Sequence, residues 1–279
     1  MPVSSLQPGI EVRDLHSGAL NQGLRLYVKL PWRYERSDAA YPVLFALDAN
    51  RSFPIYATMS LIYETPVRPG TELIVVGVGY QTDDDRLKGL AQWGAWRTRD
   101  LTPVRRKSAE DWLAGVLSAV LPDGNLPVES GEAARFLQAL SEEVIPFVDA
   151  NYRTCSADRG LGGYSDGGLF VLYALFHAPE MFTRYFAGSP SMWEELFDYE
   201  QQYAATHEDL PARLFMTAGG READTVQPMR KMAERLGARC YPGLEVLTHV
   251  FAGESHSSGM PAAISRALCA LYDEGWRRS

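Results

Sequence analysis

The sequence predicts one domain of the α/β class, in which helices cover both faces of a mostly parallel sheet. Three observations support this prediction. Short, continuously apolar runs, typical of strands buried on both faces, alternate with longer segments of helical spacing. The 279 residues are 46% hydrophobic and 22% charged, which suits a single large globular domain. No repeat, low-complexity tract or linker marks a second domain, so residues 1–279 are expected to form one unit.

The first half of the chain is expected to contribute an antiparallel pair of strands and two parallel strands. The run at 73–79 is too apolar for a sheet with one exposed face, so we place it centrally. The expected elements are strands at 11–15 and 24–30 with a turn at 21–23, a strand at 43–47 that ends in Asp48, a helix at 56–63 and the strand at 73–79.

The second half repeats the alternation of helix and strand. Residues 131–150 carry apolar side chains at helical spacing. The expected elements are that helix, a short buried strand at 158–162, a helix at 168–176, strands at 185–188 and 214–217, a helix stopped by Gly237, a strand at 244–247 and a final helix at 261–272.

A long insertion separates the strand at 73–79 from the helix at 131–150. Residues 108–111, Ser-Ala-Glu-Asp, have the form of a capping box. One apolar helical face follows, made of Trp112, Leu113, Val116, Leu117, Val120 and Leu121. This helix, within residues 104–130, is either a lid over the functional site or a helix packed on the flank of the domain, and the sequence leaves both open.

The most informative motif is Gly163-Tyr164-Ser165-Asp166-Gly167. It lies between a strand of small residues and a wholly apolar helix, which is the context of a sharp turn that presents a nucleophilic serine. Glycine is expected at both flanks because a Cβ there would collide with the backbone. A further glycine, Gly168, is expected to let the helix pack close to the sheet.

An activated serine needs a base, and five histidines are available. His256 is our choice because it follows the last strand in a loop of small residues that leaves room for the imidazole. His249, within or at the end of that strand, is the competitor. The remaining three are assigned structural or solvated positions: His16, His177 and His207.

The carboxylate that orients the base is expected in the loop after the strand at 214–217, because this kind of site orders serine, acid and histidine along the chain. Glu222 is our choice, and Asp224 is the alternative. Two backbone N–H groups should form the oxyanion hole. One belongs to Asp166, after the serine, and the other is expected from the loop at 47–51, specifically from Asn50.

Charge and composition exclude several classes of function. A net charge of -8 argues against nucleic-acid binding and gives no reason for attraction to an anionic membrane. No apolar run approaches transmembrane length, and the N-terminal residues show no secretory signal. The three cysteines lack a metal-ligand pattern and suggest reduced thiols in a cytoplasmic protein. No cofactor or metal is implied, and homo-oligomer formation is left open.

Five segments together resemble the putative esterases of the esterase D and enterochelin-esterase type. They are Tyr-Pro-Val-Leu-Phe-Ala-Leu-Asp at 41–48, Arg-Asp-Leu-Thr-Pro at 99–103, Gly-Gly-Tyr-Ser-Asp-Gly-Gly-Leu-Phe at 162–170, Ala-Gly-Ser-Pro-Ser-Met-Trp at 187–193 and Phe-Ala-Gly-Glu-Ser-His at 251–256. The resemblance covers the chain from Val12 onward. It implies an α/β-hydrolase fold and a serine esterase with Ser165 as nucleophile and His256 as base. Ala49 departs from the glycine that is usual after Leu-Asp.

The expected reaction is hydrolysis of a small or medium carboxylic ester through an acyl-enzyme on Ser165. Alternatives are acyl transfer on the same scaffold and hydrolysis of an enterochelin-like siderophore ester. We expect Asp166 to disfavour polyanionic substrates such as ferric tricatecholates, because it places a carboxylate beside the nucleophile.

Candidate substrate contacts are two arginines and several aromatic side chains. Arg97 and Arg99 could bind a substrate carboxylate as bidentate donors. Arg99 could instead pair with Asp100 and organise the insertion. Trp193 is the aromatic candidate for the substrate pocket, together with Phe53, Trp93, Trp96 and Trp112, which we expect on loops and on the insertion helix.

Overall fold

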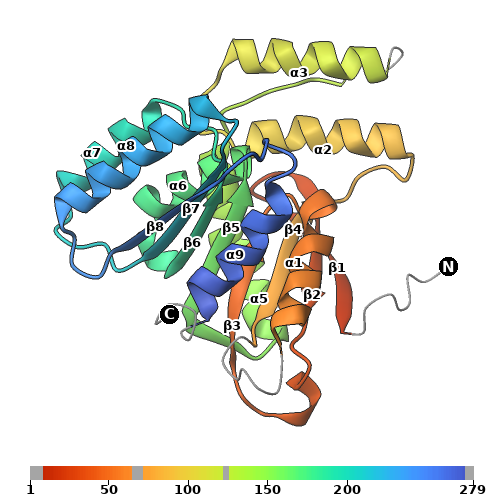
Figure 1. Ribbon diagram of the computed structural model, residues 1–279. Helices are drawn as coiled ribbons and strands as arrows, with labels where there is room; N and C mark the ends of the chain where they lie inside the picture. The colour runs from red at the N-terminus through yellow and green to blue at the C-terminus, as the bar shows by residue number, and fades with distance from the viewer. Residues whose placement is uncertain (1–8, 65–71, 122–125, 274–279) are drawn as a thin grey trace.

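The computed structural model describes residues 9–64, 72–121 and 126–273, and within them eight strands form one sheet (Figure 1). The order across the sheet is β1-β2-β4-β3-β5-β6-β7-β8. The strands are β1 (Ile10–Ser17), β2 (Gln22–Lys29), β3 (Tyr41–Ala46), β4 (Ile74–Tyr80), β5 (Thr154–Tyr164), β6 (Arg184–Gly188), β7 (Arg213–Gly219) and β8 (Glu245–Phe251). β2 pairs antiparallel with β1 and β4, and every other pairing is parallel.

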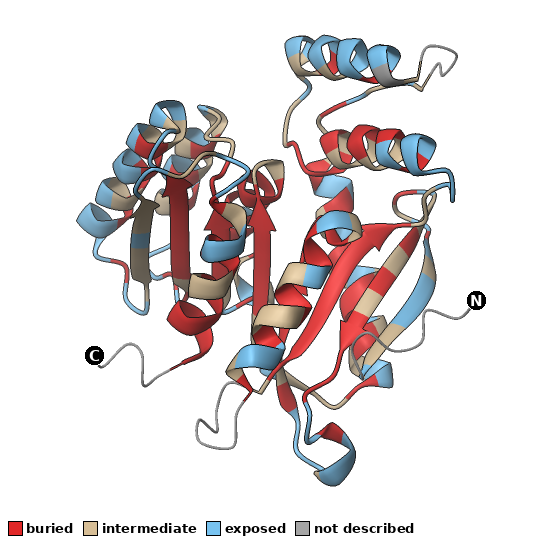
Figure 2. Ribbon diagram, turned by 45° about the vertical axis from the view of Figure 1, so that its right-hand side comes forward, coloured by how far each residue is buried: buried red, intermediate tan, exposed pale blue. Residues whose placement is uncertain are grey.

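Helices cover both faces of the sheet (Figure 1). α1 (Ala49–Tyr63) and α9 (Met260–Tyr272) pack on one face around Phe53, Tyr56 and Leu268. The other face is covered by α4 (Ala133–Ala139) with α5 (Ile145–Asn151), α6 (Asp166–His177), α7 (Glu195–Ala204) and α8 (Ala223–Arg239). Most buried residues lie in the strands β2 to β7 and in these helices, and α6 is buried along nearly its whole length (Figure 2). The fold is therefore the predicted α/β-hydrolase architecture.

Several predicted boundaries differ from those of the structure. The first turn spans residues 18–21, because Ser17 pairs with Gln22 and both Gln22 and Gly23 belong to β2. β5 is twice as long as the expected run at 158–162, since its polar first half is also extended. The predicted helix at 131–150 contains a π-helical segment, Leu140–Val144, between α4 and α5. α8 continues past Gly237 and ends at Arg239, where Cys240 adopts the left-handed conformation that terminates helices.

Two helices were not predicted, and both carry signals that could have revealed them. α2 (Arg86–Asp100) begins after Asp85, whose carboxylate accepts hydrogen bonds from the N–H groups of Leu87 and Lys88. α7 buries Leu196 and Tyr203, seven residues apart, on one face. Both helices are rich in charged and polar residues, so neither was recognised from apolar spacing.

The insertion consists of α2 and α3 (Lys107–Val120), which lie together beyond one end of the sheet (Figure 1). α3 packs on α2 through Leu113 and Leu117, which contact Ala91 and Ala95. Trp112, on the same expected apolar face, is 71% exposed.

The predicted capping box is wrong. The N-cap of α3 is Arg106, and Ser108 lies within the first turn. Glu110 is instead buried, where it accepts hydrogen bonds from Ser130 and Arg105. Residues 122–125 of the insertion, and the N-terminal residues in which a secretory signal was sought, lie outside the described residues.

No helix in the described ranges is long and apolar enough to cross a membrane.

Candidate active site

Ser165 lies at the turn between β5 and α6, with φ 62° and ψ −121°. A non-glycine residue rarely adopts a positive φ, and strain of this kind often marks functional sites. The turn is held by the Ser165 N–H, which donates to the Gly188 carbonyl at 2.9 Å. Ser165 is the N-cap of α6, yet its side chain makes no capping hydrogen bond. Its hydroxyl group is therefore not used by the helix.

The glycines around Ser165 have different steric roles. A Cβ on Gly163 would lie 2.3 Å from the Gly167 carbonyl oxygen, so this position requires glycine, as predicted. A Cβ on Gly168 would lie 3.0 Å from both the Gly188 oxygen and Pro190, which shows how closely α6 approaches β6. The prediction for Gly167 is wrong. The atom nearest to a Cβ on Gly167 would be a carboxylate oxygen of Asp48 at 3.3 Å, and not a backbone atom.

His256 and Glu222 are in contact, although 34 residues separate them. His256 lies in the loop after β8, and Glu222 lies between β7 and α8. The distance from His256 Nδ1 to Glu222 Oε1 is 2.5 Å. Glu222 Oε2 accepts hydrogen bonds from the Gly219 N–H at 2.7 Å and from the Ser189 hydroxyl at 2.8 Å. When Nδ1 donates to Glu222, the Nε2 lone pair of a neutral imidazole is available to accept a proton.

Tyr164 supports the His256 loop, a role that was not predicted from the sequence. Its ring contacts the imidazole of His256 edge to face, with centroids 5.2 Å apart. Its hydroxyl donates to the His256 carbonyl at 2.8 Å and lies 2.8 Å from the Ser189 hydroxyl. Burial raises the pKa of Tyr164 to about 12, so the phenol stays neutral and can donate at neutral pH. Its position directly before the serine was the available signal.

Three other histidines contact aromatic rings, among them His207, which stacks on Tyr203 at 4.1 Å. His249 lies in β8, with its ring 4.4 Å from that of Phe251. Burial and the nearby charge of Arg266 lower the pKa of His249. His177 ends α6 and stacks on Tyr173 at 3.9 Å. Asp224, the alternative acid, is exposed in the first turn of α8.

The two expected oxyanion donors each lie in the first turn of a helix. Asn50 was expected in a loop, but α1 begins at Ala49. The side chain of Asn50 pairs with the backbone of Tyr80, and the N–H of Asp166 opens α6. First-turn N–H groups have no acceptor within their own helix, and the helix dipole favours an anion there.

Arg97 connects the starts of α1 and α6, the two helices that carry these donors. Its Nε and one terminal nitrogen bind the Asp48 carboxylate at 2.8 and 2.9 Å, and its other terminal nitrogen binds Asp166 at 2.8 Å. The Ser191 hydroxyl donates to the second oxygen of Asp166 at 2.6 Å. Burial alone would lower the pKa of Arg97, but the charges of Asp48 and Asp166 outweigh it and raise the pKa.

This arrangement changes the expected electrostatics beside the serine. The expectation that Asp166 repels polyanionic substrates took its carboxylate as unpaired. In the structure Asp166 is ion-paired with Arg97, which it shares with Asp48, so the three side chains together keep one net negative charge. Arg97 itself is only 12% exposed and engaged with two carboxylates, which weakens its candidacy as a substrate anchor.

Arg99 pairs within the protein as well. It binds both oxygens of the buried Asp100 carboxylate, at 2.7 and 3.0 Å, and donates to Gln22 on β2 at 2.7 Å. This geometry favours the alternative in which Arg99 organises the insertion.

The aromatic candidates for the substrate pocket lie on different elements of the fold. Phe53 is in α1 and belongs to the core, and Trp93 and Trp96 are in α2, so their placement on loops was wrong. Trp193 follows β6 and lies under the guanidinium of Arg106, with 4.1 Å from the Arg106 Cζ to the ring centroid. Trp193 thus links the β6–α7 connection to the start of α3.

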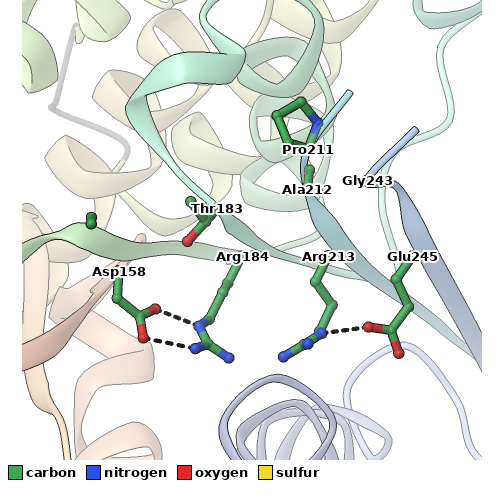
Figure 3. Close-up of a pocket in the computed structure, with 9 residues that line it drawn as sticks. Asp158, Thr183, Arg184, Pro211, Ala212, Arg213, Gly243 and Glu245 are labelled. Carbon is green, nitrogen blue, oxygen red and sulfur yellow. Dashed lines mark hydrogen bonds and ion pairs between the residues drawn. The ribbon is translucent and has the colours of Figure 1, made fainter. Parts of the chain in front are cut away.

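The pocket in Figure 3 lies among the strand starts, away from Ser165. It has a volume of about 330 Å³. Arg184 binds the Asp158 carboxylate at 2.5 and 2.7 Å, and Arg213 binds Glu245 at 2.7 Å. Both arginines also donate to the Leu271 carbonyl at the end of α9. These contacts stabilise the C-terminal end of a helix.

No group of three or more His, Cys, Asp or Glu residues suited to a metal ion occurs in the described parts of the chain.

Comparisons with known proteins point to esterases. Residues 124–243 match the model of the family described as "Putative esterase". The chain is 29% identical to the ferri-bacillibactin esterase BesA of Bacillus subtilis, over 96% of this chain and 91% of the relative. It is 26% identical to a siderophore triacetylfusarinine C esterase of Aspergillus fumigatus, over 84% and 82% of the two chains.

Solved structures show the same fold. The BES protein of Bacillus cereus superposes with a TM-score of 0.79 at 24% identity, covering 96% of this chain and 97% of the other. The siderophore hydrolase EstB of Aspergillus nidulans gives 0.76 at 24% identity, over 98% of both chains. Residues 124–243 thus resemble the family described as "Putative esterase", the chain has the α/β-hydrolase fold, and it is an enzyme that hydrolyses ester bonds.

Proposed function

We propose that this esterase hydrolyses the ester bonds of a siderophore. The observation that carries the proposal is the similarity, over nearly the whole chain, to a ferri-bacillibactin esterase, with a second long match to a triacetylfusarinine C esterase. The carboxylesterase activity expected from the sequence is the same chemistry, ester hydrolysis, without a named substrate class. The siderophore alternative agrees better with these relatives.

The proposed mechanism uses Ser165 as nucleophile. His256 accepts the hydroxyl proton as Ser165 attacks the ester carbonyl, and Glu222 holds the imidazole and stabilises its charged form. The N–H groups of Asn50 and Asp166 are the proposed donors to the oxyanion. His256 then protonates the leaving alcohol. Water, activated by the same imidazole, hydrolyses the acyl-enzyme and releases the acid.

The charges around the site are compatible with an acidic substrate. The Asp166 carboxylate beside the nucleophile is paired with Arg97, which also binds Asp48. Arg51 is exposed in the first turn of α1, with its guanidinium 5.1 Å from the Trp93 ring centroid. Arg106, at the start of α3, lies over Trp193 and is ion-paired with Glu195 at 2.5 Å. We therefore propose that the α2–α3 insertion forms a wall of the substrate site, with Arg51 of α1 facing acidic groups of the substrate.

Siderophore hydrolysis is tested with the compounds named for the relatives. Bacillibactin and triacetylfusarinine C, each with and without ferric iron, are incubated with the enzyme, and the products are separated and identified by mass spectrometry. We expect kcat/KM for at least one of them to exceed that for p-nitrophenyl acetate by about 100-fold, because distant substrate contacts contribute binding energy in the transition state.

The control for this assay is the Ser165→Ala variant, which should leave the siderophores intact. Faster cleavage of p-nitrophenyl acetate, with no cleavage of any siderophore, would contradict the proposal. Adding an alcohol distinguishes hydrolysis from acyl transfer, because a transferase would yield a new ester in place of the acid.

The role of Glu222 is tested against its neighbour Asp224. Glu222→Gln should lower kcat/KM by about 1,000-fold, because an amide cannot stabilise the imidazolium that forms during attack. Asp224→Asn should leave kcat/KM within about twofold of wild type, since Asp224 is exposed in the first turn of α8. Steady-state kinetics with p-nitrophenyl acetate decides between them. A large loss only in Asp224→Asn would reassign the acid.

A further inference from the structure

The proposed oxyanion donors belong to two different helices whose first turns must hold a fixed relative position. α1 follows β3 and α6 follows β5, and these strands are neighbours in the sheet, with Ala46 opposite Gly162. Oxyanion donors act at 2.7–3.1 Å from the developing charge, so a small shift of either helix would cost activity. The sheet alone positions the strands, but the turns that follow them need their own restraint.

Arg97 supplies a direct link between these turns. It lies on α2, outside both strand-to-helix connections, and binds Asp48 before α1 and Asp166 in α6 through three hydrogen bonds. Its planar guanidinium has fixed donor directions, so it sets geometry where a lysine would supply only a point charge. The Ser191 hydroxyl fixes the remaining oxygen of Asp166.

Asp48 shows a second consequence of this link. It is the N-cap residue of α1, a position where aspartate normally accepts a hydrogen bond from an N–H of the first turn. Here Asp48 has φ 58° and makes no such side-chain bond. Both of its carboxylate oxygens bind Arg97 instead. The carboxylate that would otherwise compete for the N–H of Asn50 is thus held away from it.

We propose that Arg97 is a positioning residue for catalysis, which aligns the oxyanion donors of Asn50 and Asp166 and keeps the Asp48 carboxylate away from the first turn of α1. This inference rests on the proposed function, since it takes Ser165 as the nucleophile. Without Arg97, Asp48 would be free to cap α1, and the Asp166 carboxylate would stand unpaired beside the oxyanion. Arg97 acts through these groups and does not itself contact the reacting atoms.

The first test compares Arg97→Met with a matched control, Arg159→Met. Arg159 pairs with Asp149, is similarly shielded at 16% exposure, and precedes Ser165 by six residues on β5, about 20 Å along the strand. We expect Arg97→Met to lower kcat for p-nitrophenyl acetate by about 100-fold while KM changes less than about twofold. Arg159→Met should lower the melting temperature and leave kcat within about twofold of wild type.

A merely structural role for Arg97 is excluded by a second readout. Binding of a small alkyl boronic acid, which forms a tetrahedral anion on the serine, should weaken by the same factor as kcat/KM. Arg97→Lys keeps the charge and protects the fold, so it provides the test if Arg97→Met is unstable. We expect kcat of Arg97→Lys to fall by about tenfold, because an ammonium group cannot reproduce the forked hydrogen bonds of the guanidinium.

Three outcomes would overturn the inference. One is a kcat within twofold of wild type in folded Arg97→Met or Arg97→Lys. Another is a rise in KM confined to acidic esters, which would make Arg97 a substrate anchor. The third is full recovery of kcat in Arg97→Met/Asp166→Asn, which would show that charge neutralisation alone is needed. Fluorophosphonate labelling of Ser165 in the same variants separates these outcomes from failure of the proposed nucleophile.

Discussion

Replacing Ser165 by alanine is expected to lower kcat for p-nitrophenyl acetate hydrolysis by about 10⁶-fold, because no acyl-enzyme can form without the hydroxyl. The fold should be retained. The backbone contacts of the turn, from the Ser165 N–H to Gly188 and from Leu169 and Ser191 to the Ser165 carbonyl, do not involve the side chain. The measurement is steady-state kinetics, with the melting temperature recorded for both proteins.

The control for this variant is Ser191→Ala, a neighbouring serine whose N–H binds the Ser165 carbonyl. Ser191 donates its hydroxyl to Asp166, so its loss should lower kcat by about tenfold or less. If Ser165→Ala kept more than about 1% of wild-type activity in a preparation free of contaminating esterases, Ser165 would not be the nucleophile.

Replacing His256 by alanine is expected to lower kcat by about 10⁵-fold or more, whereas His249→Ala should keep most of the activity. The reason is geometric. The His256 imidazole is oriented by Glu222 at 2.5 Å, and the His249 ring packs on Phe251. Both variants are compared with wild type in the same ester assay and by thermal unfolding.

The two histidine variants serve as controls for each other. A loss in His256→Ala that accompanied unfolding would not concern catalysis, so the comparison requires two folded proteins. Equal losses of activity in both, with unchanged melting temperatures, would mean that the base is not His256 alone. Activity lost only in His249→Ala would assign the base to the last strand.

The parts of the site that follow from local sequence were predictable. The serine turn depends on Gly163, two residues before the serine, and this steric need is visible in the motif itself. The long apolar helix after it and the buried β4 also follow from short runs of sequence. Glu222 and His256 were identified from the order of loops in this kind of fold, and the structure brings their side chains together.

The parts that depend on distant contacts were not predictable. Arg97 was predicted to be available for the substrate, because its partners Asp48 and Asp166 are 49 and 69 residues away in the sequence. Tyr164 and Ser189 lie inside recognised motifs, but their contacts with the His256 loop and Glu222 were not predicted. α2 carries little apolar periodicity, because the residues that it buries include glycine and alanine, and α3 and α4 pack against it. One sequence cannot reveal which charges pair across such distances.

The measurement that tests the central claim most directly is covalent labelling of the intact enzyme with a fluorophosphonate, followed by peptide mapping in a mass spectrometer. A fluorophosphonate reacts with a serine that is activated by a base and adjacent to oxyanion donors, so it reports the whole proposed site. We expect one adduct per chain, located on Ser165, with loss of esterase activity in proportion to labelling. Labelling should slow strongly in His256→Ala and be absent in Ser165→Ala. An adduct on another residue, or labelling that persists in Ser165→Ala, would contradict the account.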